Sequence, residues 1–447
     1  MKRILIALCL FAAYFAAVYG LMPFHDDWSY ATAPNPDFTW SQLLPSLAFW
    51  RPFDVLWGAL MAKCPGFFPG ANRLVVVLAH TLNVFIVGKI LERMPGDGVS
   101  RWIGTLFFAL SPSVAALVVN SDTINQAWSF TFGAAALLVA LSDDSSKGRK
   151  GIVVTVLLFL SLLFKESGVS WLAVIPLVSW LKTGDVRKSA RLTIVGVGLL
   201  AVYFCVRFCL LGACALGDGQ YYALGFNPES ILINLALSIF ASLSAIDILA
   251  FVYDNWLLLL ASGALSVSFF AFWFVSADRR RSAESCIIAA LVAIAMAIPH
   301  CCFVSHHPAE MHFYPILFAG ALMLAAQPSD VRKKVFRFCS VGAMCLVFGI
   351  GWSDKMRHTY AHSRRVRVLF EELKSEKLDY SKPIYFIVDA DRTIRYYSVF
   401  SHSAAHGLDC GRACRAFNGW HNFDYHMAYT MEERMKIPVG VQVVRIK

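Results

Sequence analysis

The chain has 447 residues, of which 57% are hydrophobic and only 16% are charged, with a formal net charge of +10. About a quarter of the residues of an ordinary soluble protein are charged, so this composition excludes a soluble globular protein and indicates an all-α polytopic membrane protein. The positive charge does not indicate a nucleic-acid partner, because the basic residues lie in short loops between apolar segments rather than on a soluble basic domain.

Apolar segments recur along the first 352 residues. A helix needs about 20 apolar residues to cross a bilayer, and fewer where the membrane is thin. We expect the first segment to be a retained helix rather than a cleaved signal peptide, because it is long enough to span and two carboxylates follow it directly. The pattern predicts eleven spans, at residues 3–21, 72–91, 101–119, 126–142, 151–164, 168–181, 192–211, 255–275, 284–303, 312–326 and 335–352.

The basic residues set the orientation of these helices, because loops rich in lysine and arginine stay in the cytoplasm. With the N-terminus inside, every basic loop falls on the cytoplasmic side. This divides the chain into a membrane domain, 1–352, and a small extracytoplasmic C-terminal domain, 353–447. The external segments are then 22–71, 120–125, 165–167, 212–254, 300–311 and the tail from 353.

Two external segments are more apolar than connectors need to be. Residues 231–250 could cross the membrane, but a crossing there would place the basic run 279–281 outside. We therefore predict a helix that lies in the outer interface or re-enters from that side. The first external loop, 22–71, combines four tryptophans with prolines, which predicts short helices along the outer leaflet.

The tail is the most water-like part of the chain. Its segments KPIYFIVDA (382–390) and VGVQVVRI (439–446) have the β-branched and aromatic composition of strands, so a small mixed α/β unit is expected. Cys410 and Cys414 lie in this tail, and the sequence leaves open whether they form a disulfide, as an extracytoplasmic location would allow.

Asp26 and Asp27 follow the first apolar segment directly, at the predicted outer surface. Two adjacent carboxylates at a lipid boundary are costly to ionise. Such a pair suits chemistry in which one carboxylate acts as a general base while the other orients it. The alternative is that the pair caps a short helix beginning near Trp28, because aspartate is a favoured N-cap.

Lys165 and Glu166 interrupt an apolar hairpin on the same predicted side. A lysine there can meet a phosphate as a point charge, and Arg51, ahead of Pro52, could do the same. The alternatives are an ordinary ion pair within the hairpin, and an arginine that extends to lipid headgroups.

His80 and Asn83 are three residues apart and so share one helix face, where they either bond between helices or line a cavity. Further along, His300, His306, His307 and His312 cluster near Glu310. Their spacing matches no standard zinc pattern, so no metal site is predicted.

Taken in order, HDDWSYATAPNPDF, FWRPFDVLWGAL and ANRLVVVLAHTLNVFIVGKIL resemble the opening of the GT-C glycosyltransferase superfamily, and most of all its protein O-mannosyltransferase-like branch. LLFKESGVSW looks like that branch's Lys-Glu hairpin, and AEMHFYPILFAGALML looks like the entry to a later span. The likeness runs over about residues 20 to 326. It departs from the family pattern at Met311, where an arginine is expected, so that phosphate contact is either missing or taken over by His312 or Arg51.

The resemblance implies a GT-C-like catalytic membrane domain that moves a sugar from a polyprenyl-phosphate donor to a glycan, lipid or protein acceptor on the extracytoplasmic face. Asp26 would be the base beside Asp27, and Lys165 would lie near the lipid phosphate, with His80, Asn83, Glu166 and Glu310 in supporting roles. A bacterial inner membrane with a periplasmic active site is the implied location. No cofactor is assigned, and assistance by a divalent metal stays open. The alternatives are a transporter or lipid flippase, and a polysaccharide polymerase or ligase.

Overall fold

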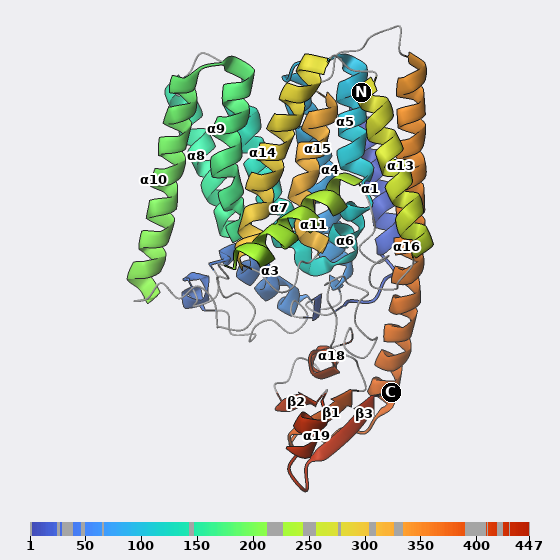
Figure 1. Ribbon diagram of the computed structural model, residues 1–447. Coiled ribbons are helices and arrows are strands. Elements are labelled where there is room, and N and C mark those ends of the chain that lie inside the picture. Colours follow the sequence, from blue (N-terminus) through green and yellow to red (C-terminus); the bar gives the residue numbers. More distant parts are fainter. Residues whose placement is uncertain are drawn as a thin grey trace.

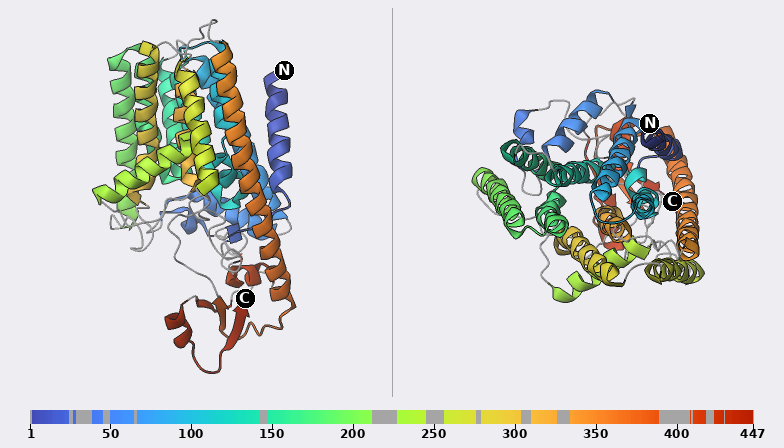
Figure 2. Two further views of the ribbon diagram at one scale, coloured as in Figure 1. Left: turned by 45° about the vertical axis from the view of Figure 1, so that its right-hand side comes forward. Right: turned by 90° about the horizontal axis from the view of Figure 1, so that it is seen from above.

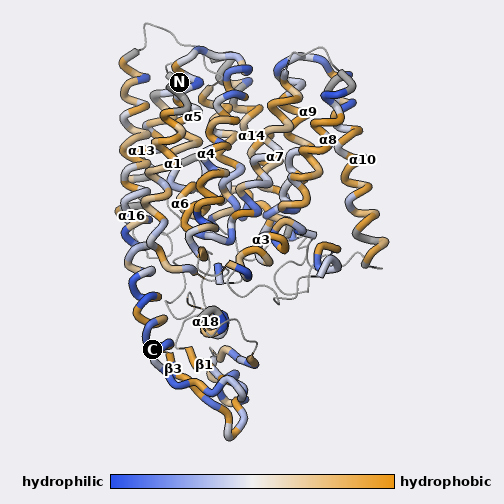
Figure 3. Tube along the Cα trace, turned by 180° about the vertical axis from the view of Figure 1, so that it is seen from behind, coloured by the Kyte–Doolittle hydropathy of each residue, from blue (hydrophilic) through white to orange (hydrophobic). Residues whose placement is uncertain are grey.

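The computed structural model is a bundle of long helices with a small α/β unit hanging from one end (Figure 1). Figure 3 shows an apolar band along the middle of the bundle and hydrophilic helix ends, as expected of a chain that lies in a bilayer. The described residues are 2–24, 27–28, 39–45, 50–64, 67–142, 147–211, 227–244, 256–275, 279–303, 310–325, 334–388, 408, 410–417, 423–428 and 430–446.

Helices occupy the apolar ranges that hydropathy selects. The first half of the chain forms α1 (Lys2–Val18), η1 (Trp40–Leu43), α3 (Pro52–Lys63), α4 (Gly70–Glu92), α5 (Gly98–Leu110), α6 (Ser113–Val119), η3 (Ser121–Thr123), α7 (Ile124–Ala140), α8 (Lys147–Phe164), η4 (Glu166–Val169) and α9 (Ser170–Thr183). The second half forms α10 (Val186–Leu211), α11 (Pro228–Ser244), α13 (Trp256–Val275), α14 (Arg279–Phe303), η5 (Glu310–Ile316), α15 (Leu317–Ala325) and α16 (Lys334–Ser375).

Among the described residues, three helices are long and apolar enough to cross a membrane by themselves: Gly70–Glu92, Ser189–Val206 and Val335–Ser375. Gly98–Leu110 and Ser113–Val119 together would make a fourth span, bent by 47°. Pro112 lies in the break, where it cannot donate a backbone hydrogen bond. The sequence predicts this stretch as one uninterrupted span, so the bend is a correction. The full number of eleven spans stays a prediction.

The ambiguous segment 231–250 is helical up to Ser244 as part of α11, and its last residues lie outside the described part. In Figure 1, α11 runs obliquely to the long helices. Ser242 donates a hydrogen bond to the Phe313 carbonyl at 3.4 Å, which ties α11 to η5. The oblique course agrees with the prediction that this segment does not cross. In the first external loop, α3 and η1 are the short helices that its composition predicts.

The boundary predicted at residue 352 is wrong as a helix end, because α16 continues to Ser375 (Figure 1). Hydropathy falls after Trp352, but residues 353–375 contain no proline or glycine, so nothing stops the helix. Pairs such as Asp354–Arg357, one turn apart, add local support. A single helix therefore passes from the membrane bundle into the C-terminal unit.

The C-terminal unit contains a three-stranded parallel sheet, which confirms the two predicted strands. The third strand lies between them in the sequence and at one edge of the sheet. The strands are β1 (Ile384–Val388), β2 (Tyr425–Ala428) and β3 (Gln442–Ile446), in the order β2-β1-β3, with α18 (Cys410–Phe417) and α19 (Met431–Met435) beside them. Phe386 on the central strand pairs with Met427 and Val444. Cys410 and Cys414 are buried on α18 and are not bonded to each other.

Aromatic side chains fill the core where α7, α9 and η5 meet. The Phe130 ring lies 5.1 Å from the rings of both Trp171 and Tyr314. Trp171 can lie this close because Gly133 has no side chain: a Cβ there would lie 2.0 Å from the indole. The glycine is therefore needed for packing rather than for backbone freedom.

We expect Gly133→Ala to lower the free energy of unfolding by about 1–3 kcal/mol, the usual cost of overpacking a core. Gly198→Ala on α10 is the matched control, because nothing lies within 4 Å of the added methyl group. Thermal unfolding of the detergent-solubilised variants measures the difference. Equal midpoints for the two variants would contradict the packing argument.

Candidate functional site

Asp27 lies in the segment after α1, whose last turn is at the end of the bundle that faces the C-terminal unit (Figure 1). The Asp27 side chain is fully buried. Its Oδ1 accepts hydrogen bonds from the backbone N–H groups of Ser121 at 2.6 Å and Asp122 at 2.9 Å. Its Oδ2 accepts one from the Phe24 N–H at 3.0 Å. Asp27 therefore caps η3, at the start of α7, and is itself helical together with Trp28.

A buried arginine, which the sequence analysis does not single out, holds the same segment. Arg73, near the start of α4, donates hydrogen bonds to the carbonyls of Leu21 and, at 2.7 Å, Met22. Burial raises the pKa of the Asp27 carboxyl from its ordinary value of 3.8 to about 6, although the Arg73 charge and the backbone N–H groups oppose the rise. The acidic segment, which is the stretch around Asp27 after α1, is thus bound by α4 through Arg73 and by η3 through its backbone N–H groups. Asp26, the predicted base, lies outside the described residues.

Arg51 and Glu166 form an ion pair between the start of α3 and η4, with 2.7 Å between Nη2 and Oε2. The guanidinium Nε also donates to Oε2 at 3.0 Å and to Oε1 at 3.3 Å, so two guanidinium nitrogens contact the carboxylate and both of its oxygens accept. Burial opposes the ionisation of Glu166, but the Arg51 charge and hydrogen bonds, a backbone hydrogen bond and the Lys165 charge together outweigh it and lower the pKa of this carboxyl. The pairing differs from the predicted alternative of an ion pair between Lys165 and Glu166.

Lys165 lies between α8 and η4 and is 9% exposed. Among the described residues, no carboxylate lies within ion-pairing distance of its ammonium, although Asp122, Glu166 and Asp54 act on it at longer range. Burial, followed by repulsion from Arg51, lowers the pKa of Lys165 from 10.5 to about 8. A buried cation without a close counter-ion is costly, so this position suits an anionic ligand.

His300 near the end of α14 and His312 in η5 lie beside these cations. Their rings stack at 4.0 Å between centroids, 10° from parallel. The charges of Lys165 and Arg51 act on both rings. Within the described part of the chain, Nε2 of His300 and Nδ1 of His312 are buried and have no hydrogen-bond partner. Two cations and two unpaired imidazole nitrogens therefore come together, which is a chemistry suited to phosphate oxygens.

His80 and Asn83 bond between helices, which is the first of the two predicted alternatives. His80 Nδ1 lies 3.1 Å from the Tyr314 hydroxyl, and Asn83 Nδ2 donates to the same hydroxyl at 3.0 Å. The Asn83 amide also donates to the Ala127 carbonyl at 3.1 Å. The pair therefore joins α4 to α7 and to η5, the segment that carries His312.

Glu310, at the start of η5, forms an ion pair with Lys355 of α16, and both side chains are buried. Lys355 also donates to the Pro112 carbonyl at 3.1 Å. The resemblance implies a supporting role for Glu310 but no partner for it, because the partner lies 45 residues away in the chain. Among the described residues, no group of three or more potential ligands could hold a metal ion.

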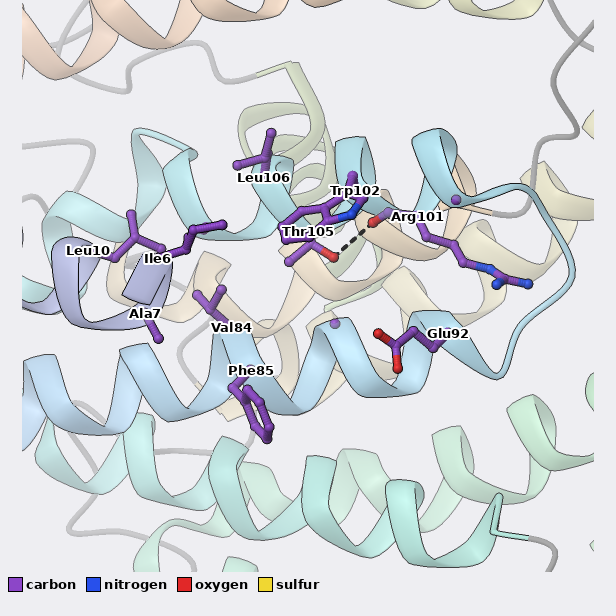
Figure 4. Close-up of a pocket in the computed structure, with 13 residues that line it drawn as sticks. Ile6, Ala7, Leu10, Val84, Phe85, Glu92, Arg101, Trp102, Thr105 and Leu106 are labelled. Atoms are coloured by element: carbon purple, nitrogen blue, oxygen red, sulfur yellow. Dashed lines mark hydrogen bonds between the residues drawn. The ribbon is translucent and has the colours of Figure 1, made fainter. Parts of the chain in front are cut away.

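A cavity of about 160 Å³ lies between α1, α4 and α5 (Figure 4). Its lining is mainly apolar, with side chains such as Leu10, Phe85 and Trp102, and it includes Glu92 and Arg101. It brings together none of the predicted site residues. The candidate site is therefore the polar cluster of Arg51, Lys165, Glu166, His300 and His312. Asp122 links this cluster to Asp27, because its charge acts on Lys165 and its backbone N–H donates to the Asp27 carboxylate.

The long helices, the short helices beside them and the polar cluster belong to a membrane-type helical fold that is also found in a solved structure. The fold is similar to that of ArnT from Cupriavidus metallidurans, solved with undecaprenyl phosphate bound, with a TM-score of 0.51. The two sequences are 13% identical, and the match covers 97% of this chain and 86% of that chain. No family model and no curated protein matches the sequence. The likeness concerns the fold alone, and it does not show the O-mannosyltransferase-like branch.

Proposed function

We propose that the protein is a membrane glycosyltransferase that moves a sugar from a polyprenyl-phosphate donor to an acceptor on the extracytoplasmic face. The observation that carries this proposal is the cluster of buried Lys165 with the partly buried Arg51, His300 and His312, whose charges and unpaired nitrogens suit a lipid phosphate. The fold supports it, because the similar ArnT structure contains undecaprenyl phosphate.

In the proposed reaction, the acceptor hydroxyl attacks the anomeric carbon while Asp26 takes its proton. The bond from the anomeric carbon to the phosphate oxygen breaks, and the phosphate leaves with its negative charge. Lys165 and Arg51 meet that charge in a site where water is scarce, which strengthens the attraction. Asp27 fixes the segment that carries the base through its three backbone contacts.

The experiment is to incubate the purified chain in liposomes with undecaprenyl-phosphate monosaccharides labelled in the sugar, together with acceptor-containing membranes. We expect free undecaprenyl phosphate and a labelled acceptor to form together. A transporter or flippase would move the lipid without breaking the sugar–phosphate bond. Intact donor with every sugar of the panel would contradict the proposal.

The proposed topology has eleven spans, a cytoplasmic N-terminus and an external C-terminal unit. The arrangement in Figure 1 supports it, because α1 begins at one end of the bundle and the C-terminal unit lies beyond the other. We expect alkaline phosphatase fused after Lys447 to be active, and the same enzyme fused at 184–185, within the basic stretch 182–191, to be inactive. The reverse pattern would overturn the orientation.

A further inference from the structure

One helix, α16, contacts both halves of the candidate site. Lys355 forms the buried ion pair with Glu310, which begins η5 two residues before His312. Ser363 lies further along the helix, and its hydroxyl accepts a hydrogen bond from the Met22 N–H at 2.8 Å. The first contact reaches the phosphate side of the site, and the second reaches the acidic segment.

Further contacts hold the acidic segment against α16. Tyr360 donates to the Ala17 carbonyl at 2.7 Å, and Arg367 donates to the Gly20 carbonyl at 2.8 Å. The Phe370 ring stacks on Trp28 with 5.6 Å between centroids. Figure 2 shows α1 and α16 next to each other at one side of the bundle. The chain on both sides of the acidic pair is therefore bound to this helix.

The spacing between the two contacts is rigid. Lys355 and Ser363 are eight residues apart in continuous helix without proline or glycine, which corresponds to about 12 Å along the axis. A buried ion pair often stabilises a fold no better than apolar residues would. Stability alone therefore does not explain the Lys355–Glu310 pair, and we assign it the role of orienting η5 against α16. The pair can do this because it fixes where η5 begins.

We infer that Lys355 and Ser363 are positioning residues, and that α16 sets the distance between the phosphate site and the acidic segment. This inference rests on the proposed function. Lys355 acts through Glu310 on His312, so its loss weakens binding of the lipid phosphate. Ser363 acts through Met22 on the acidic segment, so its loss slows transfer and leaves phosphate binding unchanged.

The first test measures the affinity of the full chain for undecaprenyl phosphate. We expect Lys355→Met to weaken it by roughly tenfold to a hundredfold, since small displacements of a binding group have effects of this size, and Lys355→Arg to restore most of it. Arg337→Met is the control, because Arg337 is also a buried cation of α16, paired with Asp97 at 3.2 Å, towards the opposite end of the bundle. It should leave the affinity unchanged.

If Lys355→Met does not fold, the double variant Glu310→Gln with Lys355→Met leaves no lone charge buried and carries the same test. Normal affinity in a folded variant without the pair overturns the role of Lys355. If Arg337→Met weakens the affinity as well, a general loss of stability of α16 explains both results, and the positioning role of Lys355 is overturned.

The second test measures turnover and KM with the undecaprenyl-phosphate sugar that the wild-type chain uses. We expect Ser363→Ala to lower kcat about tenfold with an unchanged KM, which corresponds to roughly 1.4 kcal/mol, and Ser363→Thr to recover it. An unchanged kcat in Ser363→Ala overturns this half of the inference. Failure of the proposed function looks different, because the wild-type chain itself would then release no undecaprenyl phosphate.

Discussion

Replacing Asp26 by asparagine should reduce sugar transfer by about 10²–10⁴-fold, the usual contribution of a general base. Asparagine keeps the shape of the side chain and can still cap a helix, but it cannot accept a proton from the acceptor hydroxyl. Binding of the donor should be unchanged, because the phosphate is held by other residues. Turnover measured beside undecaprenyl phosphate affinity separates the two effects.

Asp27→Asn is the matched comparison, because it alters the adjacent carboxylate. Asp27 uses both oxygens to accept backbone N–H groups, and an asparagine has only one acceptor oxygen. One buried donor would lose its partner, at a cost of about 1–3 kcal/mol in stability. We expect lower thermal stability with a milder loss of transfer. If Asp27→Asn abolishes transfer while Asp26→Asn does not, the base is the neighbouring residue.

The pH dependence of folding gives a second view of Asp27. Its pKa is raised by burial to about 6 in the folded chain, from an ordinary 3.8. The folded state therefore binds this proton more tightly than the unfolded state, so the carboxylate lowers stability as pH rises from about 4 to about 6. The three hydrogen bonds reduce that loss without removing it. The segment is retained despite an unfavourable burial, as expected of a functional site.

The sequence predicts the helices well because crossing helices leave a long apolar signal. It misses two features whose causes are not apolar. The break at Pro112 lies inside one apolar run, and hydropathy averages over it. The helix α16 extends beyond Trp352 because no helix breaker follows. The predicted boundary at residue 352 marks where the side chains change from apolar to polar, which is where the chain would leave the membrane. A fall in hydropathy marks a membrane surface and does not mark a helix end.

In the candidate site, too, some features can be predicted from the sequence and others cannot. Lys165, Arg51 and His312 can be predicted because charged or histidine side chains beside apolar runs stand out, and the structure brings them together. Their partners cannot be predicted, because ion pairs such as Arg51–Glu166 and Glu310–Lys355 join distant parts of the chain. Arg73 also leaves a signal, since it is a lone cation at the start of an apolar helix. His300 is visible only as one member of a histidine-rich loop.

Replacing Lys165 by methionine should weaken binding of undecaprenyl phosphate by roughly tenfold to a hundredfold, because a hydrogen bond to a charged group contributes about 1.5–3 kcal/mol. Lys182→Met is the control: this lysine donates to the Leu141 carbonyl at 2.8 Å, at the other end of α9. Its loss should leave the affinity unchanged. Equal affinities in the wild-type chain and Lys165→Met would return Lys165 to a structural role.

The same lysine predicts the direction of the pH effect. Its pKa is lowered to about 8, so it is charged below that pH and loses its proton above it. A phosphate monoester is already doubly charged above pH 7, because its second pKa is about 6, so the ligand does not change there. Affinity for undecaprenyl phosphate should therefore fall as pH rises above 8. Bound phosphate stabilises the charged lysine, so the fall should occur at a somewhat higher pH in the complex than in the free chain. Lys165→Arg keeps its charge throughout and should bind with no fall up to pH 10, and a fall of equal size in that variant would show that a different group titrates.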